Sequence, residues 1–420
     1  MYRIILLAGA TALGVGWLCT AHAASGLTNI YSFADGNDGG FPESGLTPDA
    51  VHHVFYGTTT SGGAGHNGVV FSLAPPAQTG GAWTETPLYS FTGGNDGGIP
   101  TANVSVDPKT GAIYGTTYQG GADGYGVVFE LTPPAVSGGA WTETVLHTFT
   151  GGNDGGDPDG QLIEDAQGNL YGAASEGGTG VVGVVFALSP PAGGQTAWTE
   201  TVLYNFTGNS DGGEPLGDLV FGPGHALYGA TAGYGSDNSG TIYALTRPTS
   251  PGGTWGFNLI HTFAGGAAGE VPRAGMIYGR DGNLYGTTAG FASSQGSVFQ
   301  LIPPTTKAGA FTYNVLYDFS GLGFDGNGPW APVSMDAHGN LYGTTLGVGL
   351  SSNGEIFKLA PPASPGGQWT ETVPYYFNGG TDGQFPYSNV VILGRDLFGT
   401  TYGAAGQSGF YPGTVWEYQP

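Results

Sequence analysis

Short apolar runs alternate with glycine-rich turns along nearly the whole chain. Examples are residues 68–71 (Gly-Val-Val-Phe) and 88–91 (Leu-Tyr-Ser-Phe), which are rich in β-branched or aromatic residues. Runs of this kind, bounded by Gly, Pro or Asn-Asp turns, are typical of β-strands. No segment shows the period of an amphipathic helix. The pattern therefore predicts an all-β protein built from short strands.

The same runs return with an even period. The phrase Tyr-Gly-Thr-Thr, or a close variant, begins at seven positions that lie 56 to 58 residues apart: Tyr56, Tyr114, Tyr171, Tyr228, Tyr285, Tyr342 and Phe398. Each unit goes on with a Gly-Val-Val-Phe run, usually a Pro-Pro pair, then a Trp-Thr-Glu-Thr run and an Asn-Asp-Gly-Gly turn. Four strands in each of seven units predict a seven-bladed β-propeller, in which the Pro-Pro to Trp connection is extended.

The two ends of the repeat region complement each other. The last unit stops after its third strand, at residues 416–418, while the N-terminal run at 27–33 resembles fourth strands such as 202–206. We therefore expect the N-terminal strand to complete the last blade and close the ring, which removes two exposed sheet edges. A linear β-solenoid would explain the period but not this complementation.

The first 23 residues resemble a signal peptide. Arg3 precedes an apolar stretch at 4–18, and Ala21-His22-Ala23 forms an A-x-A cleavage signal. We therefore expect a signal peptide at 1–23 and a single propeller domain at 24–420. Cleavage near Ala23 would give a secreted, periplasmic or cell-surface protein with no transmembrane segment in the mature chain. A retained anchor, or lipid attachment at Cys19, fits the pattern less well.

The charge balance narrows the choice of partners. The chain has 8 Lys and Arg against 31 Asp and Glu, for a net charge of −23. Such an acidic surface repels nucleic acid and anionic polysaccharide, so no nucleic-acid partner is expected. The sequence also lacks a His/Cys metal pattern, a phosphate-binding Gly-Lys loop and a nucleophile elbow. No catalytic residue is predicted.

Six of the Asn-Asp-Gly-Gly loops carry an aspartate that a closed ring would bring around the upper mouth of the channel: Asp38, Asp96, Asp154, Asp211, Asp325 and Asp382. A ring of carboxylates could bind a cation, and calcium is the one cofactor that the sequence suggests. The other interpretation is turn chemistry, because Asp and Asn bond to their own backbone. The loops lack the alternating carboxylates of a dedicated calcium loop, which favours the turn.

Positions at which the units differ are better candidates for a ligand site than positions that repeat. The candidates are aromatic residues in the loops, together with two residues near the atypical fifth-unit loop: Tyr118, Tyr234, Phe291, Trp330, Tyr402, Glu270 and Arg273. Aromatic rings on a concave face can stack on sugars or hold a peptide. The other interpretation is packing between neighbouring loops.

The Asn-Leu-Tyr-Gly-Thr-Thr and Gly-Val-Val-Phe runs give the chain a family resemblance. Over about residues 27–420 it resembles the choice-of-anchor tandem repeat GloVer-containing proteins of bacteria. The resemblance implies an exported, repeat-built surface or secreted protein, and it transfers no catalytic residues.

Three functions fit these observations. The leading hypothesis is an extracellular binding or scaffold module for a glycan or a protein. The alternatives are a polysaccharide lyase or glycoside hydrolase that works in the propeller funnel, and a structural surface-layer component.

Overall fold

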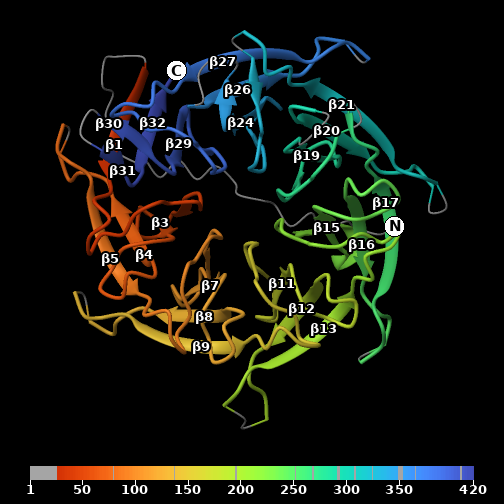
Figure 1. Ribbon diagram of the computed structural model, residues 1–420, viewed down its shortest axis with the longest axis horizontal. Coiled ribbons are helices and arrows are strands. Elements are labelled where there is room, and N and C mark those ends of the chain that lie inside the picture. Colours follow the sequence, from red (N-terminus) through yellow and green to blue (C-terminus); the bar gives the residue numbers. More distant parts are fainter. Residues whose placement is uncertain are drawn as a thin grey trace, which may run out of the picture.

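Seven four-stranded antiparallel sheets stand in a ring, so the predicted seven-bladed β-propeller is confirmed (Figure 1). The computed structural model describes residues 26–420 apart from 79, 137, 194–195, 251, 267–268, 291–293, 307–308, 324, 349–352, 365 and 407–408. The expected signal peptide at 1–23 and the candidate Phe291 lie outside the described residues.

Each blade runs from an innermost strand beside the channel to an outermost strand at the rim. In the first three blades the strands are β2 (Thr47–Asp49), β3 (Val54–Thr59), β4 (Val69–Ala74) and β5 (Thr84–Ser90); β6 (Ser105–Val106), β7 (Ile113–Thr117), β8 (Val127–Thr132) and β9 (Thr142–Thr148); β10 (Ile163–Glu164), β11 (Leu170–Ala174), β12 (Val184–Ser189) and β13 (Thr199–Asn205). The fourth and fifth blades hold β14 (Val220–Phe221), β15 (Leu227–Thr231), β16 (Thr241–Thr246) and β17 (Gly256–Thr262); β18 (Ile277–Tyr278), β19 (Leu284–Thr288), β20 (Ser297–Ile302) and β21 (Thr312–Asp318).

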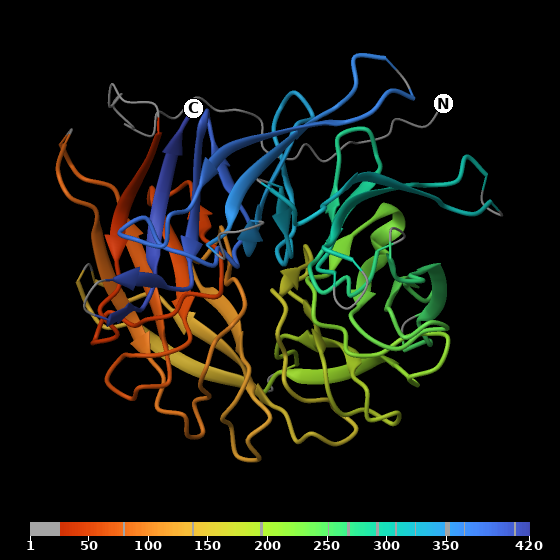
Figure 2. The same cartoon turned by 45° about the horizontal axis from the view of Figure 1, so that its top comes forward.

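The last two blades follow the same plan. They hold β23 (Ser334–Met335), β24 (Leu341–Thr345), β26 (Glu355–Ala360) and β27 (Thr370–Tyr376); β28 (Val391–Leu393), β29 (Asp396–Thr401), β32 (Thr414–Gln419) and β1 (Gly26–Ser32). Two small ribbons lie in the loops: β22 (Gly326–Asn327) with β25 (Gly347–Val348), and β30 (Ala404–Gly406) with β31 (Gly409–Tyr411). The long connections between third and fourth strands project as hairpin arms (Figure 2).

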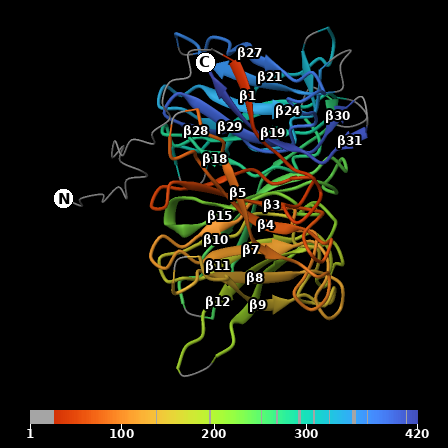
Figure 3. The same cartoon turned by 90° about the vertical axis from the view of Figure 1, so that its left-hand side faces the viewer.

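The strand β1 closes the ring, as expected from the complementary ends. It pairs antiparallel with β32, with Leu27 opposite Tyr418 and Asn29 opposite Trp416. Figure 3 shows β1 among the C-terminal strands of the last blade. The expectation of a fourth strand supplied by the N-terminal run is therefore confirmed.

Two repeated motifs pack against each other inside each blade. In the first blade Gly57 of β3 lies opposite Phe71 of β4. A Cβ at Gly57 would come within 2.6 Å of the Phe71 ring, so only glycine leaves room for this buried side chain. The Gly of Tyr-Gly and the Phe of Gly-Val-Val-Phe are thus parts of one core contact.

The first Thr of Tyr-Gly-Thr-Thr joins neighbouring blades. The Thr58 hydroxyl donates to the backbone carbonyl oxygens of Pro100 and Ala102, at 3.1 Å each. Thr344 makes the equivalent bonds to Pro386 and Ser388, at 2.9 Å each. In these two units the bonds hold the segment that enters the channel just before the innermost strand of the next blade.

Helical structure is nearly absent from the described part of the chain. It amounts to one 3₁₀ turn, η1 (Pro223–His225). No helix among the described residues is long and apolar enough to cross a membrane.

Candidate functional site

A cavity of about 260 Å³ occupies the upper part of the central channel, above the innermost strands. Every blade contributes the residue that follows the proline of its entry segment. These seven residues are all different: Glu43, Thr101, Asp159, Leu216, Arg273, Trp330 and Tyr387. Each of them is half-buried. We call this space the upper cavity.

An unusual backbone conformation presents these side chains. The residue before each proline has a positive φ of 55° to 63°, namely at Phe41, Ile99, Asp157, Glu214, Val271, Gly328 and Phe385. Six of the seven are not glycine, and Ile99 and Val271 are β-branched. Such residues rarely adopt this region, at a cost of roughly 1–3 kcal/mol each.

Hydrogen bonds from two neighbouring blades hold this conformation. In the fifth unit the N–H of Val271 donates to the carbonyl of Ser239 at 3.0 Å, and its own carbonyl accepts from the N–H of Ala289 at 3.0 Å. The other six units repeat both bonds. The backbone is therefore fixed by its surroundings, and the residue after the proline is free to vary without loss of the turn.

Charged groups from separate blades converge in the upper cavity. The Arg273 Nη2 lies 3.9 Å from Asp159 Oδ2, and its guanidinium lies 4.2 Å from the centre of the Trp330 ring. The Arg273 side chain is 30% exposed and that of Asp159 20%. A partly desolvated arginine held between a carboxylate and a ring is a preorganised hydrogen-bond donor.

Two carboxyl groups of the cavity, those of Glu43 and Asp159, have pKa values above those of the same groups in water. Burial raises the pKa of Glu43 to about 7, with help from the charge of Asp159 and against the pull of Arg273. Burial also raises the pKa of Asp159, against the effects of Thr101 and Arg273. Glu43 therefore changes charge near neutral pH, in a space shared with a second carboxyl group.

Aromatic rings form an arc on one side of the cavity. The rings of Trp330 and Tyr387 are 5.2 Å apart, and Tyr387 lies 5.4 Å from Tyr402. Tyr402 in turn lies 5.2 Å from Phe41. The arc starts inside the cavity and continues onto the loop face, where it offers apolar ring surface to a ligand.

Polar side chains join entry segments of nearby blades at the lower end of the cavity. Asn103 Nδ2 donates to Asn389 Oδ1 at 3.2 Å, and the Gln161 N–H donates to Asp218 Oδ1 at 2.6 Å. A Cβ at Gly45 would come within 2.0 Å of Asn389, so glycine makes room for the Asn103–Asn389 hydrogen bond. A second cavity of about 430 Å³ lies beyond, also lined by Asn103 and Asn389.

The predicted ligand residues separate into two groups. Arg273 and Trp330 line the upper cavity, and Tyr402 belongs to its aromatic arc. Tyr118 lies near two acidic residues, Asp157 and Asp159. Burial, followed by the charges of these two residues, raises the pKa of Tyr118.

Two other candidates have packing roles. A Cβ at Gly213 would come within 2.7 Å of the Tyr234 ring, so that ring covers a loop backbone. Glu270 is 8% exposed and accepts hydrogen bonds from the N–H and the hydroxyl of Ser294, which tie down a neighbouring loop. Its sequence position beside Arg273 does not bring it into the lining of the upper cavity.

Five of the seven variable residues of the upper cavity are absent from the sequence-based predictions: Glu43, Thr101, Asp159, Leu216 and Tyr387. The signal was present in the sequence. When the units are aligned on the proline, the next position holds a different amino acid in every unit. Most of the aromatic candidates lie instead in the loops that follow the Tyr-Gly motif.

The six loop aspartates bond to their own turns. Asp96 accepts the N–H of Thr92 at 2.8 Å and the hydroxyl of Tyr89, on the outermost strand, at 3.0 Å. The other five repeat the backbone bond, and all except Asp154, which faces His147, repeat the tyrosine bond. They therefore lie against the outermost strands and not around the channel, and within the described ranges no three His, Cys, Asp or Glu gather as a metal site.

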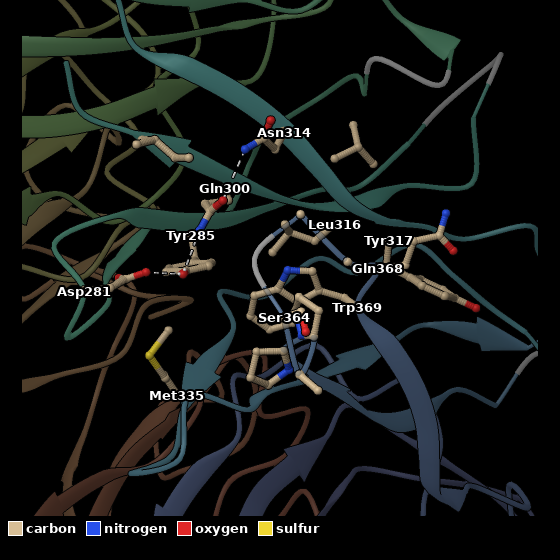
Figure 4. A pocket seen from close by; sticks show the side chains of 18 of the residues that line it. Asp281, Tyr285, Gln300, Asn314, Leu316, Tyr317, Met335, Ser364, Gln368 and Trp369 are labelled. Carbon is tan, nitrogen blue, oxygen red and sulfur yellow. Dashed lines mark hydrogen bonds between the residues drawn. The ribbon is translucent and has the colours of Figure 1, made fainter. Parts of the chain in front are cut away.

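A larger cleft of about 1210 Å³ lies between the fifth and sixth blades (Figure 4). Its polar wall is a chain of hydrogen bonds in which the Tyr285 hydroxyl donates to Asp281, Gln300 donates to Tyr285, and Asn314 donates to Gln300. Trp369 packs edge-on against Tyr285, the contact that Trp141 makes with Tyr56 elsewhere in the ring. These polar groups bond to each other within a repeated framework, so the upper cavity is the stronger candidate site.

Comparisons with known proteins give a family and a fold. The model of the Gloeobacter/Verrucomicrobia repeat matches residues 6–220, 135–322 and 227–420. Among curated proteins none matches the sequence. A solved structure of a proposed 6-phosphogluconolactonase from Bacteroides uniformis is 16% identical, with 79% of this chain and 84% of that chain covered and a TM-score of 0.47. A protein of unknown function from Dyadobacter fermentans is 13% identical, with 94% and 98% covered and a TM-score of 0.44.

Proposed function

This chain belongs to the Gloeobacter/Verrucomicrobia repeat family, and from that premise we propose that it is an exported β-propeller that binds a neutral glycan in its upper cavity. The observation that carries the proposal is the convergence of seven different side chains at one repeated position. A purely structural ring would have no need of a different residue in each blade.

The chemistry of the cavity suits a sugar. Sugars offer hydroxyl groups to donors and acceptors and C–H faces to aromatic rings. Arg273 supplies donors, Glu43 and Asp159 supply acceptors, and Trp330 and Tyr387 supply rings. Such a mixture of apolar surface and a few placed polar groups is typical of small-ligand sites.

The charge of the protein favours a neutral ligand. Arg273 is the single cation among the residues that line the upper cavity, against three acids: Glu43, Asp159 and Asp218. The net charge of −23 adds to the repulsion of anionic chains. The volume of about 260 Å³ admits one small group and is too small for a protein surface, so a protein partner would have to insert a single side chain.

A panel of immobilised neutral glycans tests the proposal. We expect the purified protein to bind at least one of them, and Trp330→Ala to lose that binding. Arg273→Ala should also weaken the binding. Its matched control is Arg247→Ala, because Arg247 forms the same kind of pair with Asp165, also at 3.9 Å, away from the cavity. Absence of binding to every neutral glycan would contradict the proposal.

A second function, cleavage of a glycan, is favoured by one observation. Glu43, with its pKa raised to about 7, could donate a proton at neutral pH while Asp159 acts as its partner carboxyl. Glycoside hydrolases work with a pair of carboxyl groups, one of which keeps its proton at neutral pH. Release of sugars from neutral polysaccharides that is lost in both Glu43→Gln and Asp159→Asn would support an enzyme. Binding without release supports the binding module.

A further inference from the structure

The upper cavity is enclosed on every side. All seven blades contribute to its lining, and the pairing of β1 with β32 leaves no gap in the ring. A groove lies open along its length to a polymer, but a pit surrounded by all seven blades is entered along the axis of the channel. The shape therefore restricts which part of a chain can enter.

Polar side chains line the lower end of the pit, which we call its floor. The Asn103–Asn389 hydrogen bond joins the second blade to the seventh across the entry segment of the first. The Asn103 Oδ1 accepts the N–H of Gly45, and Asp218 accepts the N–H of Gln161, so these side chains are fixed by the backbone below them. Asn103 and Asn389 line both the upper cavity and the cavity below it, so they mark the level at which the two meet.

We propose that the upper cavity receives the end of a glycan chain, with the terminal sugar in the pit and the rest of the chain leaving over the aromatic arc. The inference rests on the proposed function and adds which part of the glycan is recognised. A volume of about 260 Å³ is below the ~300–1,000 Å³ of most ligand pockets, which fits a single sugar unit.

The two levels of the site would meet different parts of the ligand. The carboxamides of Asn103 and Asn389 lie at the floor, where only the terminal unit reaches. Tyr402 is absent from the cavity lining but contacts Tyr387, so it lies at the exit, where the next units would stack. Floor contacts should therefore affect every chain length, whereas exit contacts should affect only longer chains.

The first test compares chains with and without ends. Linear malto-, cello-, xylo- and manno-oligosaccharides of increasing length, and the cyclic glucans as end-free probes, are titrated by calorimetry. We expect the affinity per chain to level off after a few units, and cyclic glucan to bind at least ~100-fold more weakly than the linear chain of the same sugar, a difference of about 2.8 kcal/mol.

The outcomes separate this inference from the proposed function. An affinity per chain that keeps rising in proportion to length, or equal binding of linear and cyclic glucan, would overturn recognition of the chain end while leaving glycan binding in place. No binding of any neutral probe would overturn the proposed function itself.

Two variants test the division into floor and exit. Asn389→Ala should weaken the binding of every chain length by a similar factor, about tenfold. Tyr402→Ala should leave a monosaccharide unaffected and weaken only the longer chains. Asn103→Ala is the second floor variant if Asn389→Ala unfolds, and Asn314→Ala in the inter-blade cleft is the control. Equal effects of Asn389→Ala and Tyr402→Ala on all lengths would contradict the proposed orientation.

Discussion

Each entry loop holds two positions, five residues apart, that behave in opposite ways. In the second unit these are Asp96 and Thr101. The first position is an aspartate in six units and caps its own turn each time, while the second is different in all seven units and faces the channel. The same short loop therefore carries a constant structural residue and a variable lining residue.

The fifth unit shows that the two positions vary independently. Its loop has no aspartate at the first position, where Ala268 stands, yet it supplies Arg273 to the upper cavity. The entry segment keeps its conformation through the backbone bonds of Val271. Residues that repeat from unit to unit thus build the ring. Residues that vary at a fixed structural position line the cavity, where a ligand would contact them.

The largest expected effect comes from removing a repeated aspartate. Asp96→Ala deletes the acceptor for the Thr92 N–H, the Thr92 hydroxyl and the Tyr89 hydroxyl, and should lower the free energy of unfolding by about 3 kcal/mol. Denaturant titration measures this loss. The matched control is Thr101→Ala in the same loop, expected to cost less than about 1 kcal/mol. Equal losses would remove the distinction between the two positions.

A second prediction concerns a residue that varies without facing the cavity. Glu355 is fully buried at a position held elsewhere by Val, Thr or Ser. Burial, followed by the charges of Glu371 and Asp325, raises its pKa to about 9. Since this pKa lies above the unfolded value of 4.5, the folded state keeps the proton and stability falls as pH rises from about 4.5 to about 9.

Glu355→Gln keeps the shape and removes the titration. It should raise the free energy of unfolding by about 2 kcal/mol at pH 8 and have little effect at pH 4. Denaturant titrations at the two pH values measure the difference. A variant that is no more stable than wild type at pH 8 would show that Glu355 is ionised without cost.

Arg273→Ala removes a residue at the variable position. Its loss should weaken glycan binding by at least about tenfold, or 1.4 kcal/mol, because it removes the one cation of the cavity lining. The stability change should stay within about 1 kcal/mol, since the pair with Asp159 is long and partly exposed. Calorimetric titration and denaturation measure the two quantities. Unchanged binding would place the ligand elsewhere.

The smallest expected effect concerns calcium and the loop aspartates. A calcium-binding ring predicts a higher melting temperature in calcium that chelator reverses. The hydrogen bonds that already occupy these carboxylates favour no shift. A reversible rise that disappears in Asp38→Asn would reverse this expectation and restore the cation interpretation.

The fold could be predicted from the sequence because the same pattern of strands and turns occurs in seven units. The period predicted the blades, and the orphan run at 27–33 predicted the closing strand, since both depend on local pattern alone. The turn role of the aspartates followed from the same local chemistry.

The candidate site could be predicted only in part, because its residues come from different blades of the ring. Asp159, Arg273 and Glu43 come from three blades, and their contact depends on how far each side chain reaches over the channel. Glu270 differs from these three residues. It stands near Arg273 in the sequence, but the path of its loop turns it toward Ser294.

Tryptophan fluorescence during titration with a neutral oligosaccharide reports directly on ligand binding in the upper cavity, because Trp330 lies there beside Arg273. We predict a change in emission that saturates with binding and is lost in Trp330→Phe, while calorimetry still detects weaker binding by that variant. An emission change that persists undiminished in Trp330→Phe, or calorimetric binding with no emission change in the wild type, would contradict a ligand site in the upper cavity.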